Sequence, residues 1–362
     1  MIAPFKLERY FERYEFSVPY LLSSSDAEAW RQDELLGLAD EELRAAWNDL
    51  TLGYTEVRGH PLLREAIASL YEHVTAEDVI VFAAAQEPIY ALSSVVVEPG
   101  DHVIAVVPTY QSLYEVARSR GAEVSLVPLR PEDWSVDMDA IRAALRPNTK
   151  LIVLNAPNSP TGSLPSEAEL RELFALGPLV FADEVYRFLE RDPRDRLPAG
   201  ADLEGVSLGV MSKAFGLAGL RIGWLATRDP ELRERIVAFK HYLTICSAAP
   251  SEILATVALR ARDAVLARSR GIVDANLAVL DDFFARRDDF AWVRPRAGTT
   301  GLVEIRRDVE IEDFARRLAD EEGVMILPGT VFDWPGATFR IGYARAGMPE
   351  ALARLERFAD QQ

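Results

Sequence analysis

The chain has 362 residues, 49% of them hydrophobic, which is typical of a globular protein with a substantial core. Its 40 Lys and Arg stand against 57 Asp and Glu, so the net charge is −17 and nucleic acid, which the chain would repel, is excluded as a partner. The one cysteine, Cys246, excludes an intramolecular disulfide and favours a reducing compartment, and we expect the protein in the cytoplasm.

Neither a membrane nor a metal ion is expected as a partner. Residues 1–10 are too charged for a signal peptide, and no apolar stretch approaches the ~20 residues that span a bilayer. The histidines lack metal-ligand spacing with one another or with the cysteine; they are His60, His73, His102 and His241. The sequence therefore predicts no zinc site.

Helical patterns separated by turns occupy the first 70 residues. Asp26 precedes a helical pattern over 27–36 and is predicted to be its N-cap, although its carboxylate could instead meet a basic substrate side chain. Residues 53–59 have the composition of a turn, and an amphipathic helix pattern begins at Leu63.

Strand-like and helical patterns alternate in the middle of the chain. The apolar strand-like runs are 79–82, 103–107, 124–129, 150–154, 179–182, 206–211 and 222–226. Ser166 with Glu169 forms a capping box that opens one of the intervening helices, and Gly177 closes it. This alternation predicts an α/β fold with a mostly parallel sheet between helices.

Asp183 directly follows the apolar run 179–182, so it is predicted at the carboxyl end of a buried strand. Open α/β sheets bind their ligands at that edge. A buried aspartate is costly unless a cation pairs with it. A helix N-cap is the alternative role for this residue, whereas Glu184 should point elsewhere by strand alternation.

Lys213 follows the apolar run 206–211 and has Met211, Ala214 and Phe215 around it. A lysine in apolar surroundings has a lowered pKa, as a nucleophilic amine requires. The alternative is a solvated loop lysine. Gly216 and Gly219 separate Lys213 from Arg221, a residue type that binds phosphate through two hydrogen bonds.

A change of pattern after residue 253 predicts a second, smaller α/β domain. Apolar residues recur at helical spacing over 253–287 and indicate one long helix, followed by a strand at 301–305 and a helix at 311–322. We assign residues 40–255 to the large domain, and residues 1–39 and 256–362 to the small domain.

Taken together, Asp183, Tyr186, Lys213 and Arg221 resemble the cofactor site of fold-type I pyridoxal-phosphate enzymes, the aspartate aminotransferase superfamily of class I/II. The resemblance covers nearly the full length and implies an aspartate aminotransferase-like fold with pyridoxal 5'-phosphate as cofactor. It implies that Lys213 forms a Schiff base with the cofactor and Asp183 holds the proton on the pyridine nitrogen. Tyr186 then donates to the phenolic oxygen, and Arg221 binds the phosphate.

Further landmarks of the family occur along the chain. Tyr110 matches the aromatic residue that stacks on the cofactor ring, and Arg340 the arginine that binds the substrate α-carboxylate. Tyr54 matches a tyrosine that reaches the neighbouring subunit's phosphate, which implies a homodimer. Further cofactor contacts are expected at the start of a helix and beside the lysine, from Ala84, Ala85, Gln86 and Ser212.

Two departures from the family pattern occur near the cofactor. When the family's loop is aligned on 160–162, its ring-contacting asparagine becomes Ser159, with Asn158 one position earlier, and either side chain can donate the bond. Val210 stands where many relatives carry a phosphate-binding hydroxyl, a loss for which Ser212 can compensate.

The resemblance predicts a pyridoxal-phosphate-dependent aminotransferase that moves an amino group between an α-amino acid and a 2-keto acid. The alternative is a lyase, decarboxylase or cyclase that acts on an amino acid, for example an arginine-derived one. A non-catalytic sensor is disfavoured because the chain is acidic and has no helix-turn-helix extension.

Overall fold

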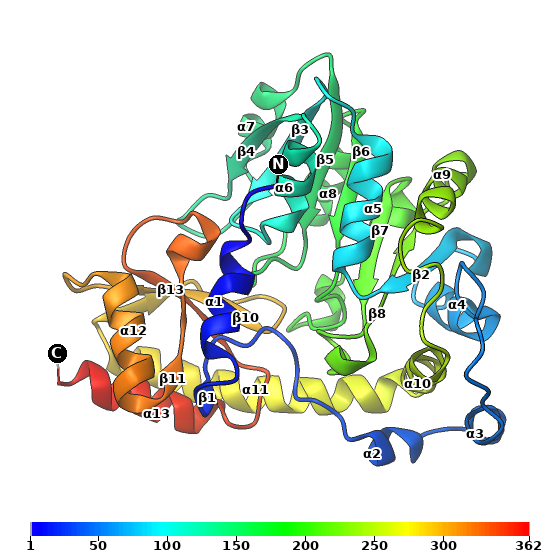
Figure 1. Cartoon of the computed structure of the whole chain (residues 1–362). Helices are drawn as coiled ribbons and strands as arrows, with labels where there is room; N and C mark the ends of the chain where they lie inside the picture. The colour runs from blue at the N-terminus through cyan, green and yellow to red at the C-terminus, as the bar shows by residue number, and fades with distance from the viewer. Residues whose placement is uncertain (1, 362) are drawn as a thin grey trace.

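The computed structural model describes residues 2–361 and is built around two sheets (Figure 1). The larger sheet has seven strands in the order β2-β8-β7-β6-β5-β3-β4. They are β2 (Val79–Ala83), β3 (His102–Val107), β4 (Glu123–Pro128), β5 (Thr149–Asn155), β6 (Leu179–Asp183), β7 (Val206–Val210) and β8 (Ile222–Ala226). β8 alone runs in the direction opposite to the other six strands. The predicted mostly parallel sheet is confirmed, and each predicted run forms one of its strands.

The inner strands are apolar along their whole length because helices cover both faces of the sheet. Alternate residues of β5 point to opposite sides, Leu151 and Val153 to one core and Ile152 and Leu154 to another. One face packs against α5 (Gln86–Val96), α6 (Ser112–Ser119) and α9 (Pro230–Lys240). The other face packs against α4 (Pro61–Ala68), α7 (Met138–Ala144), α8 (Glu167–Phe174) and α10 (Ala249–Arg260).

The smaller sheet is antiparallel, with the order β12-β13-β10-β9. Its strands and covering helices are β9 (Phe290–Trp292), β10 (Thr300–Ile305), β12 (Leu327–Pro328), β13 (Thr338–Gly342), α11 (Arg262–Arg286), α12 (Ile311–Glu322) and α13 (Met348–Ala359). The predicted strand at 301–305 and helix at 311–322 are confirmed. The predicted capping box of Ser166 and Glu169 is also present at the start of α8.

The single long helix predicted over 253–287 is wrong. The chain leaves helical geometry at Ala261, and two helices, α10 and α11, meet there. The start of α11 packs with the large sheet through Val265, whereas its later turns pack with the small sheet through Leu277. The apolar period continues across the break, so the sequence pattern does not reveal it. In Figure 1, α11 runs beneath both parts of the molecule.

The N-terminal segment joins the two parts. Helix α1 (Lys6–Tyr14) lies between them in Figure 1 and contacts η5 (Gly329–Phe332). The backbone N–H of Lys6, at its start, donates to the side-chain oxygen of Gln111 at 3.0 Å. Strand β1 (Tyr20–Leu21) pairs with β11 (Val324–Met325). Helices α2 (Gln32–Leu36) and α3 (Glu41–Asn48) instead pack against α10. The exact domain boundaries stay a prediction.

The predicted helix over 27–36 is shorter than expected, because α2 begins only at Gln32. Asp26 is therefore not its N-cap, and that prediction is wrong. Its carboxylate instead pairs with Arg345 at 2.7 Å. Within residues 2–361, no helix is long and apolar enough to cross a membrane.

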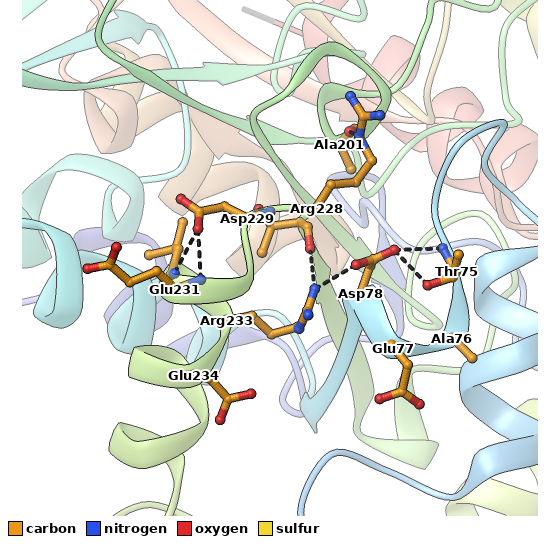
Figure 2. Close-up of polar contacts among 12 residues, drawn as sticks. Thr75, Ala76, Glu77, Asp78, Ala201, Arg228, Asp229, Glu231, Arg233 and Glu234 are labelled. Carbon is orange, nitrogen blue, oxygen red and sulfur yellow. Dashed lines mark hydrogen bonds and ion pairs between the residues drawn. The ribbon is translucent and has the colours of Figure 1, made fainter.

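An ion pair between Asp78 and Arg233 ties the edge of the large sheet to α9 (Figure 2). The two side chains are 2.6 Å apart and only 14% and 13% exposed. The other carboxylate oxygen of Asp78 accepts hydrogen bonds from the backbone N–H (2.9 Å) and the hydroxyl (2.7 Å) of Thr75. The backbone carbonyl of Asp78 accepts from Thr227 at 3.0 Å. Asp78 thus holds the start of β2, the end of β8 and α9 together.

We expect Asp78→Ala to lower the free energy of unfolding by about 2–3 kcal/mol, because it leaves the Arg233 guanidinium buried without its carboxylate. Urea unfolding followed by circular dichroism measures the change. The control is Asp263→Ala, which removes a fully exposed carboxylate and should change stability by less than about 0.5 kcal/mol. Equal stability of the two variants would contradict the structural role of Asp78.

Candidate active site

A cavity of about 320 Å³ opens at the carboxyl ends of the central strands of the large sheet. Asn155 ends β5, Asp183 ends β6 in register with it, and Lys213 follows β7. All three line the cavity, as does Arg340 from β13 of the smaller sheet. The polar residues predicted at separate strand ends therefore meet in one place.

Asp183 is a buried carboxylate without a cation. It is 4% exposed, and its Oδ1 accepts one backbone hydrogen bond, from Val185 at 3.3 Å. Burial raises the pKa of Asp183 to about 7, and the positive charge of nearby Lys213 acts in the opposite direction. Because no ion pair relieves this burial among the described residues, the site suits a ligand with a protonated ring nitrogen. Glu184 points away from the cavity and accepts from the Gly200 backbone at 2.6 Å, as predicted.

Lys213 projects into the same cavity from the turn after β7. Its Nζ donates to the Ser25 hydroxyl at 2.8 Å and lies 6.0 Å from the centre of the Tyr186 ring. The turn packs tightly against the N-terminal segment, since a Cβ on Gly216, whose φ is +66°, would lie 2.4 Å from the Glu28 carbonyl oxygen. Only glycine fits there. The tight packing fixes the direction in which Lys213 points.

An anion-binding end of the cavity forms at the start of α5. Ala84, Ala85 and Gln86 line it together with Ser212 and Arg221. Free backbone N–H groups at a helix start attract a phosphate. The guanidinium of Arg221 donates only to the Ala218 carbonyl (3.1 Å) and has no carboxylate partner among residues 2–361. These groups fit the phosphate of pyridoxal phosphate.

Tyr186 and Tyr110 also line the cavity. Tyr186 is buried at 4% exposure, next to Lys213. The Tyr110 ring packs against Phe5 with centroids 4.8 Å apart, and its hydroxyl donates to Glu8 at 2.8 Å. Burial, followed by the charge of Glu8, raises the pKa of Tyr110, so it remains a hydrogen-bond donor. Tyr110 thereby connects the cavity to α1.

Of the two residues left open in the loop after β5, Ser159 lines the cavity and Asn158 does not. The Asn158 side-chain amide makes its hydrogen bonds to the protein. Its nitrogen donates to the Pro108 carbonyl (3.1 Å), and its oxygen accepts from the Thr161 hydroxyl (2.8 Å). Sequence reasoning missed Asn155, which lines the cavity and donates to the backbone carbonyl of Asp183 at 3.0 Å. Its place at the end of a predicted strand was the available signal.

Arg340 is 3% exposed and has no carboxylate partner in the described chain. Its Nε and Nη2 donate to the Ser23 carbonyl at 3.1 and 2.7 Å, which leaves Nη1 without a protein acceptor. Burial lowers the pKa of this guanidinium. A buried, unpaired arginine on a cavity wall suits an anionic group of the ligand. Arg345, on the turn after β13, pairs with Asp26 and does not line the cavity.

Tyr54 is 93% exposed and does not line the cavity of its own chain, so its role toward a neighbouring subunit stays a prediction. Side chains of the N-terminal helix and its end do line it, and sequence reasoning did not place them there; they are Leu7, Glu8, Phe11 and Glu15. Only a long-range contact brings this helix to the cavity, and the sequence carries no local signal for it.

The raised pKa of Asp183 predicts a pH-dependent cost in the cofactor-free protein. Between the unfolded pKa of 3.8 and the folded value of about 7, the unfolded chain ionises Asp183 and the folded chain does not, so wild-type stability falls as pH rises. Asp183→Asn avoids this cost. The stability of the variant relative to wild type should therefore rise by about 4 kcal/mol between these pH values and level off above them. Urea unfolding of the cofactor-free proteins from pH 4 to 8 measures the difference, and a constant difference would contradict it.

Comparisons with known proteins agree with this geometry. The family model "Aminotransferase class I and II" matches residues 21–358. Arginine–pyruvate transaminase AruH of Pseudomonas aeruginosa is 32% identical over 84% of this chain and 81% of its own. Capreomycidine synthase of Streptomyces vinaceus is 31% identical over 82% of this chain and 78% of its own.

Solved structures share the fold. A PLP-dependent aminotransferase from Streptococcus suis superposes with a TM-score of 0.92 at 29% identity, covering 99% of this chain and 97% of its own. The PLP-dependent cyclase OrfR superposes with a TM-score of 0.88 at 24% identity, covering 100% and 98%. The chain therefore belongs to the class I and II aminotransferases, pyridoxal-phosphate-dependent enzymes of the aspartate aminotransferase fold.

Proposed function

We propose that Lys213, Asp183 and Tyr186 carry out the transfer of an amino group between an α-amino acid and a 2-keto acid. The main support is that Lys213 and Asp183 follow neighbouring strands, lack ion-pair partners in the described chain, and share a cavity with the unpaired Arg340. Bound pyridoxal phosphate supplies an electron sink for the negative charge that develops at the substrate Cα. The residues present fit that group.

Each cofactor contact has a candidate in the cavity. Asp183 holds the proton on the ring nitrogen, and Tyr186 donates to the phenolic oxygen. Arg221 and Ser212 bind the phosphate with the N–H groups at the start of α5. The remaining proposed contacts are Ala84, Ala85, Gln86, Tyr110 and Ser159, with Asn155 in place of Asn158.

Lys213 has two roles in the proposed mechanism. Its amine would hold the cofactor in the resting enzyme, and when free, its Nζ would accept the proton from the substrate Cα as general base. The Ser25 hydroxyl holds Nζ at 2.8 Å until then. Arg340 binds the substrate α-carboxylate and so orients the Cα–H bond toward Lys213. Substrate binding thus supplies the anion that Arg340 lacks.

A second candidate is another reaction at Cα, such as an elimination, decarboxylation or cyclisation. Ser159 and Val210, which depart from the family pattern, both line the cavity. The relative named capreomycidine synthase is as similar to this chain as the named transaminases are. Because the bond that breaks is decided by how the substrate is oriented, the same Lys213 and Asp183 serve either reaction.

We also propose a cytoplasmic homodimer in which Tyr54 completes the partner's site. Exposed apolar side chains gather on two neighbouring segments, which the Thr55 hydroxyl joins by donating to the Ser247 carbonyl at 3.1 Å. These side chains are Leu52, Tyr54, Tyr242 and Ile245. Exposed apolar clusters of this kind are typical of protein interfaces. The single cysteine supports the reducing compartment.

If Tyr54 donates to the partner's phosphate, Tyr54→Phe should weaken pyridoxal-phosphate binding about 10-fold through the loss of one charge-assisted hydrogen bond. Fluorescence titration of the cofactor-free dimer measures the affinity, and sedimentation confirms that the variant is still a dimer. Tyr242→Phe, at an equally exposed tyrosine, is the control and should bind as wild type does. Identical affinities for the two variants would exclude this role of Tyr54.

The central test of the proposed function is Lys213→Ala, which should lower turnover by at least ~10³-fold while the protein stays folded. Lys150→Ala, at an exposed lysine, should retain full activity. Borohydride reduction of the holoenzyme followed by peptide mass spectrometry should find the cofactor on Lys213 and on none of the other lysines, Lys6, Lys150 and Lys240. Labelling elsewhere, or full activity of Lys213→Ala, would contradict the assignment.

A further inference from the structure

The N-terminal helix contributes an acidic wall to the active-site cavity. Leu7, Glu8, Phe11 and Glu15 line the cavity, and successive members lie one, three and four residues apart, so they share one face of α1 and its C-terminal end. Asp26 joins them from the segment after β1. We call Glu8, Glu15 and Asp26 the acidic wall.

The negative charge of the acidic wall is only partly compensated by the chain. Asp26 pairs with Arg345 at 2.7 Å, and Glu8 accepts a hydrogen bond from the neutral Tyr110 hydroxyl. The Glu15 carboxylate has neither a hydrogen bond nor an ion pair within residues 2–361. Burial, and next the charge of Asp26, raises the pKa of Glu15. The carboxylates thus crowd one another where a cation would relieve them.

The other charges that line the cavity already have roles in the proposed function. Lys213 and Arg221 serve the cofactor, and Asp183 serves its ring nitrogen. Arg340 is left for the substrate α-carboxylate through its unpaired Nη1. Two carboxylates, Glu8 and Glu15, then remain without an ion-pair partner among residues 2–361, and both arginines that line the cavity already have a role.

Apolar side chains also line the cavity beside Arg340. Its guanidinium lies 5.9 Å from the Phe11 ring and 5.6 Å from the Phe332 ring, and Phe11 lies on the same helix as Glu8. Leu7 adds to this apolar surface. Such a surface suits the methylene stem of a long side chain that carries its charge at the tip.

We infer that the amino-acid substrate carries a positive charge, an ammonium or a guanidinium, at the end of its side chain, and that Glu15 binds it together with Glu8 and Asp26. The inference rests on the proposed function, because Arg340 and the cofactor determine how the bound substrate is oriented, with its side chain toward the acidic wall. It adds a specificity-determining residue, Glu15, and a class of substrate, the basic α-amino acids.

The test compares ligands of equal size that differ in charge. The unreactive 5-guanidinopentanoate and 5-ureidopentanoate, whose ureido group is uncharged, lack the α-amine, so calorimetry with the holoenzyme gives an equilibrium affinity independent of catalysis. We expect the guanidino compound to bind at least ~10-fold more tightly than the ureido compound. Added salt should weaken the binding of the guanidino compound more than that of the ureido compound.

Glu15→Gln keeps the size of the side chain and removes its charge. This variant should lose most of the ~10-fold preference while the affinity for the ureido compound stays unchanged. Glu12→Gln, at an exposed residue of the same helix that does not line the cavity, is the matched control and should keep the preference. The same order should appear in the rates at which arginine and citrulline change the spectrum of the bound cofactor.

Two outcomes would overturn the inference in distinguishable ways. Equal binding of the two compounds by wild type, or an unchanged preference in Glu15→Gln, would overturn it and leave the proposed function intact. Absence of any spectral response to arginine, citrulline, alanine and glutamate would overturn the proposed function and this inference with it.

Discussion

The structure depends on one buried charge, the Asp183 carboxylate, which the chain itself does not neutralise. An aspartate at 4% exposure with a single backbone donor costs free energy wherever no cation meets it. The large sheet places it there because β6 is buried on both faces and ends at the cavity. The neighbouring strands then bring Asn155 and Lys213 to the same edge. In the proposed function, the protonated ring of the cofactor removes this cost when it binds.

The same principle extends over the whole cavity. Arg340 at one end is a buried cation without an anion, Arg221 is an arginine without a carboxylate, and Glu15 is a carboxylate without a cation. None of these charges has an ion-pair partner among residues 2–361, so a ligand would have to supply the opposite charge. Cofactor and substrate together supply a ring cation, a phosphate and an α-carboxylate, and a basic side chain would complete the set. The unpaired charges of the cavity thus indicate which charged groups its ligands carry.

Much of this arrangement could be predicted because it is local in sequence. Each strand of the large sheet is a continuous apolar run. Asp183 directly follows one of these runs, and Lys213 follows another after one intervening residue. The boundary between α10 and α11 could not be predicted, since the apolar period continues across Ala261. Asp26 resembled a helix N-cap, and only the folded chain brings Arg345 beside it. Glu8 and Glu15 reach the cavity only because α1 packs against residues far away in the sequence, and the role proposed for Tyr54 requires a second chain.

The most direct test of the account is the visible spectrum of the purified protein with pyridoxal phosphate, titrated first with an amino acid and then with a 2-keto acid. The account predicts a yellow protein whose absorbance bleaches with the amino acid and returns with the keto acid. Bleaching that the keto acid does not reverse, with ammonia, carbon dioxide or a cyclised product released, would contradict transamination and favour the other reaction at Cα. A protein that never becomes yellow would contradict the cofactor site itself.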